Sequence, residues 1–374
     1  MPEGWGGGYM KTFSHLYKQT ISIENLLQAW IEFKKGKRKK PDVGEFERHL
    51  EDNLFALHEE LSIKKYRHGK YTDFFISDPK VRHIHKATVK DRVVHHVLYT
   101  HLYNLFDKSF IYDSYSCRLE KGTHKAVKRL EKLARIVSNN YTKPCWTLKL
   151  DIKKFFASVE HQTLLNLLKN RIQDEHILWL LCEIINSFHS EYGKDKGIPL
   201  GNLTSQVFSN IYMNELDQFV KHKLRITYYI RYADDFVILA ADKISFNLYI
   251  NLIKEFLMNE LKLELHPNKI IIRNLQWGID FLGYIVLPHY ILPRTKTKRR
   301  IFKKLKQKIE ELKNGQISQD SFNQSLQSYL GYLGHANSFR LTQKLKNQVW
   351  FWKSGIFSYK APSVFFLNML QYFL

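Results

Sequence analysis

The spacing of apolar residues predicts helices over the first part of the chain. Between residues 20 and 65, apolar positions recur every three or four residues, and a basic turn at residues 34–40 separates two such stretches. Residues 71–84 instead alternate around Pro79, which is typical of a β-hairpin. Residues 89–105 return to the helical period. We therefore expect a helix pair, a hairpin and a further helix before residue 105.

The middle of the chain mixes strand and helix patterns. Residues 145–152 predict a strand with apolar residues on one face, and a long helical pattern follows it through Ile172. Two short β-rich runs flank Ala233, Asp234 and Asp235, so we expect a tight hairpin there. Residues 281–292 resemble a second small hairpin around Pro288. Further helical patterns cover residues 177–188, 203–223 and 246–261.

The last part of the chain has a different composition. Beyond Pro293, an apolar stripe at helical spacing underlies a strongly basic run, and Gly315 ends that helix. More helix is predicted from residue 321 to residue 333. We place a domain boundary near residue 293.

Composition then narrows the class of protein. With 44% hydrophobic and 25% charged residues over 374 positions, the chain is neither disordered nor collagen-like. No apolar run approaches the roughly 18 residues of a membrane span, and the N-terminus lacks the layout of a secretory signal. Its three cysteines form no C-x-x-C pair, which argues against a disulfide framework or a zinc ribbon and favours a reducing cytoplasm.

The charge balance indicates a polyanionic partner. Lysine and arginine number 58 against 36 acidic residues, so the formal net charge is +22. Nucleic acid is the leading partner class, because neutralising phosphates releases counterions and supplies affinity. The excess is concentrated in residues 34–40 and 294–308. A solvated basic face is the alternative interpretation of either run.

Three carboxylates stand where a carboxylate is costly. Asp151 ends a mostly apolar strand, and Asp234 and Asp235 lie between aromatic residues at the predicted hairpin tip. Unpaired buried carboxylates are unfavourable, and a divalent cation resolves this, since magnesium prefers a few carboxylate oxygens plus substrate phosphates. Each motif also has a structural interpretation when it is considered alone. Asp234 and Asp235 are residues that commonly occur in turns, and Asp151 could be a helix N-cap.

In their surroundings, these residues resemble a known family. Residues 229–236 look like the Tyr-x-Asp-Asp box, and residues 148–156 like the first aspartate motif, of reverse transcriptases of the bacterial group that includes retrons, group II intron enzymes and diversity-generating retroelements. Five further stretches resemble motifs of that family in the family's order, and the resemblance covers about residues 80 to 290. These stretches are residues 82–94, 113–124, 197–206, 263–269 and 281–284.

The resemblance implies an α+β right-hand polymerase. Its parts would be an N-terminal helical extension at residues 1–70, fingers at 71–144, a palm with an antiparallel sheet at 145–292 and a helical thumb at 293–374. The implied reaction is RNA-templated addition of deoxynucleotides to a 3′-hydroxyl with two magnesium ions, for which manganese is an alternative. The implied partners are a structured noncoding template RNA, a DNA primer or the growing cDNA, dNTPs, and an accessory protein or a second copy, without a membrane. A cytoplasmic location in a bacterium, with a bacterial or phage gene, is expected.

Site roles carry over from the family by position. Asp151, Asp234 and Asp235 would be catalytic, and the same three residues with Ile152 would form the metal site. Phe156 would be a steric gate against a ribose 2′-hydroxyl. The alternative is that Phe155 and Phe156 are both core residues, but alternation sends them to different environments, so about one of the two should pack inward. The residues implied to bind the nucleotide are Arg82, Lys86, Lys90, Phe155, Phe156, Leu200, Gly201, Gln206 and Lys269.

Two further sets are expected to contact nucleic acid. The primer grip would comprise Phe281, Leu282, Gly283 and Tyr284. One face of the basic helix after Pro293 would follow the phosphate backbone while its apolar face packs. The backbone contacts would come from Arg294, Lys296, Lys298, Arg299, Arg300, Lys303 and Lys304.

The loop at residues 197–206 departs from most of the family. Leu200 stands where most relatives have glutamine, and Gln206 where they have proline, a form that looks like that of diversity-generating retroelements. An aliphatic side chain cannot hydrogen-bond a base, so we hypothesise error-prone synthesis; a simple packing change is the alternative. Two other hypotheses stay open: an antiphage defence reverse transcriptase that uses a noncoding RNA, and a non-catalytic RNA-binding scaffold.

Overall fold

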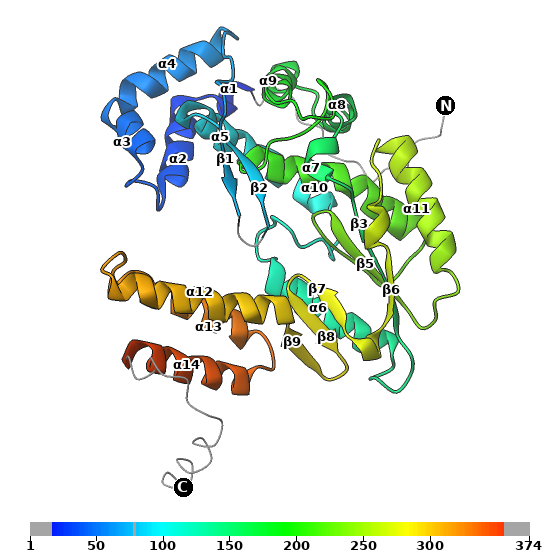
Figure 1. The fold of residues 1–374 in the computed structure, drawn as a ribbon. Coiled ribbons are helices and arrows are strands. Elements are labelled where there is room, and N and C mark those ends of the chain that lie inside the picture. Colours follow the sequence, from blue (N-terminus) through cyan, green and yellow to red (C-terminus); the bar gives the residue numbers. More distant parts are fainter. Residues whose placement is uncertain (1–16, 78–79, 355–374) are drawn as a thin grey trace. The chain divides into compact units, whose positions relative to one another are not determined.

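The computed structural model describes residues 17–77 and 80–354 (Figure 1). The chain forms two compact units. Unit 1 contains the residues up to Ala126 together with Trp146–Ile272, and unit 2 contains Val127–Cys145 together with the residues from Arg273 onward. In the described residues, no helix combines the length and the apolar character needed to cross a membrane.

Unit 1 begins with helices that were expected from apolar spacing. Ser22 caps the first long helix by accepting a hydrogen bond from the Asn25 amide, and the helix buries Leu26, Trp30 and Phe33. The predicted second helix is divided in two at His49. These helices are α1 (Tyr17–Thr20), α2 (Ile23–Lys34), α3 (Pro41–Arg48), α4 (Leu50–Ser62) and, later in the chain, α5 (Val89–Phe106).

The predicted first hairpin is present. Strand β1 (Thr72–Ile76) pairs antiparallel with β2 (Arg82–Lys86). Pro79, the expected turn residue, lies outside the described residues. Thr88 then caps α5, since its hydroxyl accepts a hydrogen bond from the Asp91 amide.

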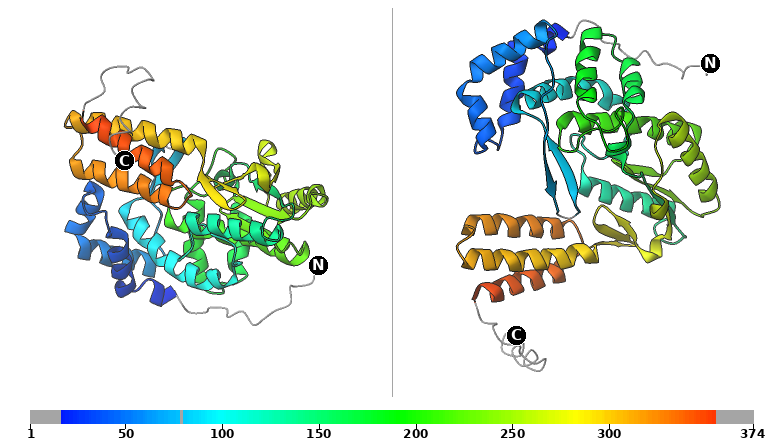
Figure 2. Two further views of the ribbon diagram at one scale, coloured as in Figure 1. Left: turned by 90° about the horizontal axis from the view of Figure 1, so that it is seen from below. Right: turned by 45° about the horizontal axis from the view of Figure 1, so that its top comes forward.

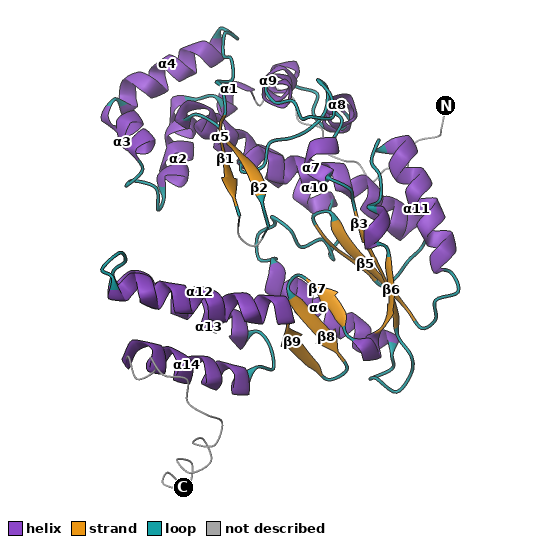
Figure 3. Cartoon of the chain, in the orientation of Figure 1, coloured by secondary structure: helices purple, strands orange, loops and turns teal. Residues whose placement is uncertain are grey.

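The larger of the sheets, called the central sheet below, has four strands in the order β4-β5-β3-β6 (Figure 3). Its strands are β3 (Trp146–Asp151), β4 (Tyr229–Tyr232), β5 (Asp235–Ala240) and β6 (Ile271–Asn274). The strand and the tight hairpin expected from the sequence are confirmed, because β4 and β5 are antiparallel neighbours and β3 pairs antiparallel with β5.

Helices follow the strands of unit 1, and one prediction among them was wrong. The single helix expected through Ile172 is divided, since Lys154 adopts a left-handed backbone (φ 45°) and Glu160 forms a β-bridge with Lys196. The helices are α7 (Phe155–Ser158), α8 (His161–Lys169), α9 (Glu175–Asn186), α10 (Leu203–Gln218) with a π-helical turn at Phe219–Lys223, and α11 (Phe246–Glu260). Short 3₁₀ turns lie at Asp107–Ser109, Pro267–Lys269 and Leu275–Trp277.

Unit 2 contains a small sheet and a helical bundle. The predicted hairpin at residues 281–292 is instead a three-stranded sheet of β7 (Ile279–Phe281), β8 (Tyr284–Leu287) and β9 (Tyr290–Pro293). The extra turn arises because Leu282 and Gly283 both take positive φ angles, 50° and 92°, which is the geometry of a two-residue hairpin loop. The helix α6 (Thr123–Val137) runs across the boundary between the two units.

Three helices complete unit 2: α12 (Thr295–Lys313), α13 (Gln319–Gly334) and α14 (Phe339–Ser354). They pack side by side (Figure 2). The predicted apolar stripe of α12 is buried at Ile301, Leu305 and Ile309, and it packs with Phe322 of α13 and Leu345 of α14.

The division into units does not follow the boundary expected near residue 293, because the small sheet is bonded to the helices after it. The Gly283 carbonyl accepts hydrogen bonds from the Arg294 amide (2.9 Å) and the Tyr332 hydroxyl (2.6 Å). The Asn337 amide donates to the Ile291 carbonyl at 2.8 Å. The assignment of fingers, palm and thumb to four segments stays a prediction.

Candidate active site

The three predicted catalytic carboxylates lie at one end of the central sheet. Asp151 is the last residue of β3 and stands opposite Asp235, the first residue of β5, in the antiparallel register. Ala233 and Asp234 form the two-residue turn between β4 and β5, and the Ile152 amide donates to the Asp234 carbonyl at 3.3 Å. The sheet pairing therefore brings residues more than eighty positions apart to one place.

Two lysines neutralise part of this negative charge. Lys269 Nζ lies 2.6 Å from Asp151 Oδ1, and Lys149 Nζ lies 3.0 Å from Asp235 Oδ2. Lys269 was predicted near the nucleotide, and it lies beside Asp151, one of the three predicted catalytic carboxylates. Lys149 was missed, although alternation along β3 puts it on the same face as Asp151, two residues later.

The remaining carboxylate charge is poorly compensated. Burial, and secondarily the nearby Asp151, raise the pKa of Asp234. Burial raises the pKa of Asp235 to about 6, against the opposing effect of Lys149. One oxygen of Asp235, Oδ1, is buried and accepts no hydrogen bond from the described residues. A cation added at this end of the sheet would therefore be favoured.

These side chains do not by themselves have the geometry of a preformed metal site. Among the described residues, no group of three or more His, Cys, Asp or Glu side chains is arranged to hold a metal ion. Asp151 and Asp235 are instead paired with lysines.

A cleft of about 890 Å³ opens beside the hairpin tip. Asp234 lines it, together with Arg82 from β2, Phe156 from α7 and Leu200 from the loop at residues 197–206. Phe155 is only 1% exposed and packs edge-on against Tyr212, whereas Phe156 is half-buried. Of the residues predicted to bind the nucleotide, Arg82, Phe155, Phe156 and Leu200 line this cleft.

The other predicted nucleotide-binding residues from β2, α5 and the loop at residues 197–206 lie elsewhere in unit 1. Lys86 pairs with Asp42 at 2.7 Å, and Lys90 pairs with Glu60 at 2.9 Å. Gly201 and Gln206 line a separate hollow of about 300 Å³ together with Lys86. The structure thus separates residues that the sequence motifs placed in one group.

Gly201 itself has a structural role. Its φ angle is 107°, and a Cβ atom there would lie 2.8 Å from the Ile84 Cγ2 atom. On either side of it, the Leu200 carbonyl accepts a hydrogen bond from the His85 amide at 3.0 Å, and the Asn202 side chain donates to the His85 carbonyl at 3.0 Å. The glycine therefore lets the loop that carries Leu200 dock closely on β2.

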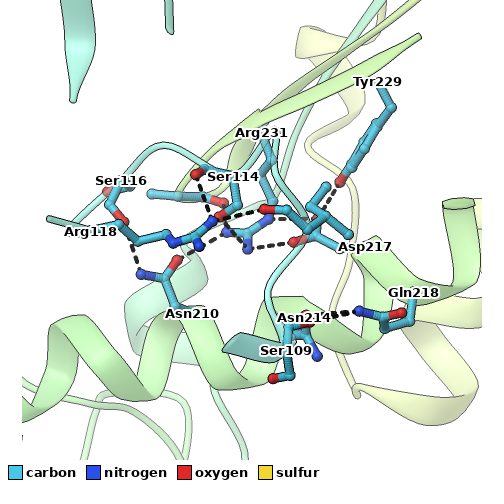
Figure 4. Close-up of polar contacts among 12 residues, drawn as sticks. Ser109, Ser114, Ser116, Arg118, Asn210, Asn214, Asp217, Gln218, Tyr229 and Arg231 are labelled. Carbon is cyan, nitrogen blue, oxygen red and sulfur yellow. Dashed lines mark hydrogen bonds and ion pairs between the residues drawn. The ribbon is translucent and has the colours of Figure 1, made fainter. Parts of the chain in front are cut away.

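A buried ion pair behind the hairpin was not predicted from the sequence. Arg231 of β4 and Asp217 of α10 are both fully buried and form two hydrogen bonds, of 2.7 and 2.6 Å (Figure 4). The Tyr229 hydroxyl donates to the same carboxylate at 2.8 Å. A signal was present in the sequence, since an arginine inside an apolar strand needs a buried acidic partner.

The expected primer grip forms the turn between β7 and β8 in unit 2. Phe281 and Tyr284 are fully buried, and Tyr284 stacks on Tyr332 with ring centroids 4.7 Å apart. Leu282 and Gly283, at the tip, are half-buried. Two of the four residues are therefore core residues of unit 2.

The basic residues predicted to contact the backbone differ in their surroundings. Arg294 pairs with Asp280 inside unit 2. Lys296, Arg299 and Lys303 are exposed on one face of α12, opposite its buried apolar stripe. The remaining three, Lys298, Arg300 and Lys304, are half-buried.

Comparison with known proteins places these features in a wider group. Residues 72–286 match a family described as reverse transcriptase (RNA-dependent DNA polymerase). The chain is 25% identical over 244 residues to Protein YkfC of Escherichia coli, a match that covers 56% of this chain and 64% of the relative. It is 22% identical over 274 residues to the group II intron-encoded protein LtrA of Lactococcus lactis, which covers 55% of this chain and 44% of LtrA.

Two other similarities are more distant. The chain is 23% identical to the putative COX1/OXI3 intron 2 protein of Saccharomyces cerevisiae over 58% of this chain and 31% of that protein. A solved structure of telomerase from Candida albicans, in complex with a fragment of telomeric RNA, covers 77% of this chain and 56% of its own with a TM-score of 0.49 and 12% identity. The matches span less than two thirds of the length of each of these curated relatives.

Proposed function

Because the chain belongs to the reverse transcriptase (RNA-dependent DNA polymerase) family, which residues 72–286 match, we propose that it synthesises DNA on an RNA template. The α+β fold predicted for a right-hand polymerase is confirmed at the level of this family. The carrying observation is that Asp151, Asp234 and Asp235 meet at the end of the sheet, where Asp234 lines a cleft of about 890 Å³.

The chemistry of these carboxylates fits divalent cations. They are crowded, burial raises the pKa of two of them, and Asp235 Oδ1 is buried without a partner among the described residues. Asp151, Asp234 and Asp235 would hold the ions, with the main-chain carbonyl of Ile152, whose side chain offers no donor atom. When bound, two magnesium or manganese ions would supply activation of the primer 3′-hydroxyl and stabilisation of the leaving pyrophosphate.

The cleft provides contacts for an incoming nucleotide. Arg82 lines it and would bind the triphosphate, while Lys269, beside Asp151, adds a second positive charge near the carboxylates. The half-buried Phe156 ring would collide with a ribose 2′-hydroxyl and so select deoxynucleotides. The Phe155 ring is packed in the core, so the steric gate against the 2′-hydroxyl would be Phe156 alone.

The nucleic-acid substrates would be a structured noncoding RNA template and a DNA primer or cDNA. The exposed basic face of α12 supports phosphate contacts, because Lys296, Arg299 and Lys303 lie three and four residues apart along it. An accessory protein or a second copy of the chain is a further proposed partner.

The decisive experiment replaces Asp234 by asparagine. Primer extension on an RNA template should fall by on the order of 10³-fold or more, because a carboxylate that faces the reacting centre is lost. The matched control is Asp242→Asn, which makes the same chemical change at an exposed position just beyond β5. RNA binding and thermal stability should be similar for both variants, and DNA synthesis by the Asp234→Asn protein at the control rate would exclude the assignment.

The same assay separates an enzyme from a non-catalytic RNA-binding scaffold. A scaffold would bind RNA but would show no metal-dependent incorporation of dNTPs, even in the unmodified protein. Incorporation that requires Asp234 would exclude the scaffold.

We further propose that Leu200 lowers fidelity. It lines the same cleft as Phe156 and Asp234, and an aliphatic side chain offers no hydrogen bond to the nascent base pair. Leu200→Gln should lower the frequency and the range of misincorporated nucleotides in the cDNA. Leu200→Met is the control, because it keeps an apolar side chain. An unchanged spectrum in the glutamine variant would contradict this proposal.

A further inference from the structure

All five N–H groups of the Arg231 guanidinium donate hydrogen bonds, and one of these bonds reaches the turn that carries Asp234. Figure 4 shows Arg231 with its partners Asp217, Ser114 and Asn210. Nε and Nη2 each donate to one oxygen of Asp217, at 2.7 and 2.6 Å. Nη2 also donates to Ser114 Oγ at 3.1 Å, and Nη1 donates to Asn210 Oδ1 at 3.4 Å. The fifth hydrogen bond runs from Nη1 to the main-chain carbonyl of Ala233 at 3.0 Å.

We propose that Arg231 is a positioning residue for the catalytic hairpin: by holding the Ala233 carbonyl, it fixes the turn that presents Asp234 to the cleft. The inference rests on the proposed function, since it concerns the same site. It assigns the buried pair of Arg231 and Asp217 a role in the geometry of the reaction as well as in the stability of unit 1.

The turn needs such a restraint. Ala233 has a φ angle of 55°, in the left-handed region that residues with a Cβ atom seldom adopt. Its carbonyl belongs to the peptide group that joins it to Asp234, so the bond from Arg231 fixes the plane directly before the catalytic residue. Without that bond, the peptide plane could rotate and carry the Asp234 carboxylate away from its place in the cleft.

Arg231 is itself held by two other parts of unit 1. Asp217 and Asn210 both come from α10, and Asn210 in turn donates to the Ser116 carbonyl at 2.8 Å. The Arg231 main chain pairs with the segment beside β4, because its amide donates to the Asp113 carbonyl (2.9 Å) and its carbonyl accepts from the Tyr115 amide (3.0 Å). A planar guanidinium held on so many sides cannot shift without breaking several bonds together.

Arg231→Lys is the direct test, because lysine keeps the charge but cannot bind both oxygens of Asp217 and the Ala233 carbonyl together. The turnover rate of primer extension, measured per folded molecule, should fall about 10- to 100-fold, as for residues that orient metal ligands. The divalent-ion concentration for half-maximal rate should rise several-fold, on the order of 3- to 10-fold. The KM for dNTP and the Kd for template–primer should stay within about 2-fold, since neither partner touches Arg231.

A matched control is available in the same neighbourhood. Arg118 also makes several hydrogen bonds, to Asp107 (2.6 Å) and to the carbonyls of Ile111 (2.7 Å) and Ser114 (3.1 Å), and its side chain is only 8% exposed. None of its described bonds reaches the catalytic turn. Arg118→Lys should therefore lower the thermal stability while the turnover rate and the ion dependence of the folded protein stay unchanged.

The outcomes separate this inference from the proposed function. If the unmodified protein incorporates no dNTPs, the proposed function fails. If it is active and Arg231→Lys keeps its rate and ion dependence, only the positioning role is overturned. Should Arg231→Lys not fold, Asp217→Glu retains the charge pair but displaces the guanidinium; it should show the same loss of rate and the same ion shift, and unchanged values would also overturn the proposal.

Discussion

The hairpin end of the sheet and the basic helix α12 use charge in opposite ways. Behind the hairpin, Arg231 and Asp217 are both fully buried and bonded at 2.6 and 2.7 Å. On α12, the cations Lys296, Arg299 and Lys303 stand in solvent above a buried apolar stripe. A buried pair costs desolvation and is sensitive to geometry, whereas exposed cations act at a distance and respond to salt. The buried pair is suited to holding the turn at Ala233 and Asp234 in place, and the exposed cations are suited to attracting a polyanion.

The largest expected effect comes from removing one member of the buried pair. Asp217→Asn should lower the free energy of unfolding by about 3 to 5 kcal/mol, because it leaves the Arg231 charge buried without a counter-charge. Urea unfolding followed by far-ultraviolet circular dichroism measures this directly. Asp242→Asn, an exposed change of the same kind, should alter the free energy of unfolding by less than about 0.5 kcal/mol. Similar values for the two variants would remove the contrast between buried and exposed charge.

A second expected effect concerns the pH dependence of stability. Burial raises the pKa of Asp235 from 3.8 to about 6, so between these pH values the folded protein holds a proton that the unfolded chain has released. The contribution of this carboxyl is therefore fully present below about pH 4 and is lost as the pH rises to about 6, by up to about 3 kcal/mol. The asparagine in Asp235→Asn cannot ionise, so the free energy of unfolding of this variant should not show this part of the decrease with rising pH.

The measurement is chemical unfolding of both proteins from pH 4 to 7 without added divalent ions. The difference in free energy of unfolding between the Asp235→Asn variant and the unmodified protein should grow in favour of asparagine over this range. A difference that is constant with pH would show that Asp235 titrates at its ordinary value.

Close packing near the cleft gives a third, smaller effect. Gly201→Ala should lower the free energy of unfolding by about 1 to 3 kcal/mol, because its Cβ would lie 2.8 Å from Ile84 Cγ2 at a φ angle of 107°. Gly44→Ala, in α3 with open space around it, should instead be neutral or stabilising by up to about 1 kcal/mol. Thermal unfolding of the two variants compares them, and a tolerated alanine at position 201 would mean that the loop does not depend on this close approach.

The smallest effect is expected on α12. Lys303→Gln should reduce the slope of log Kd against log salt concentration by about 1 for RNA binding, with a loss of affinity that is similar for all sequences. Fluorescence anisotropy over a series of salt concentrations measures it. Lys169→Gln, an exposed lysine at the end of α8, is the control and should leave the slope unchanged. If the two variants behave alike, the basic face of α12 does not contact the backbone.

Much of the local structure could be predicted because it depends on neighbours in the chain. The stripe at Ile301, Leu305 and Ile309 has the helical period and is buried as expected. The strand that ends at Asp151 and the hairpin around Asp234 also follow from alternation and turn chemistry. One prediction failed, because the helix expected through Ile172 is broken. Lys86 and Lys90 lie in ion pairs outside the cleft, and their role in nucleotide binding stays a prediction.

By itself, the sequence determined the order of the motifs and the periodic faces of the helices. It also identified three acidic residues whose partial burial would be costly without a compensating cation. Only the tertiary structure decided which residues form ion pairs. Lys269 pairs with Asp151, Lys149 pairs with Asp235, and Arg231 of β4 pairs with Asp217 of α10. The physical reason is that periodicity acts over a few residues, within one helix or strand. An ion pair between distant residues exists only after separate elements have packed, and its strength depends on how much water that packing has removed.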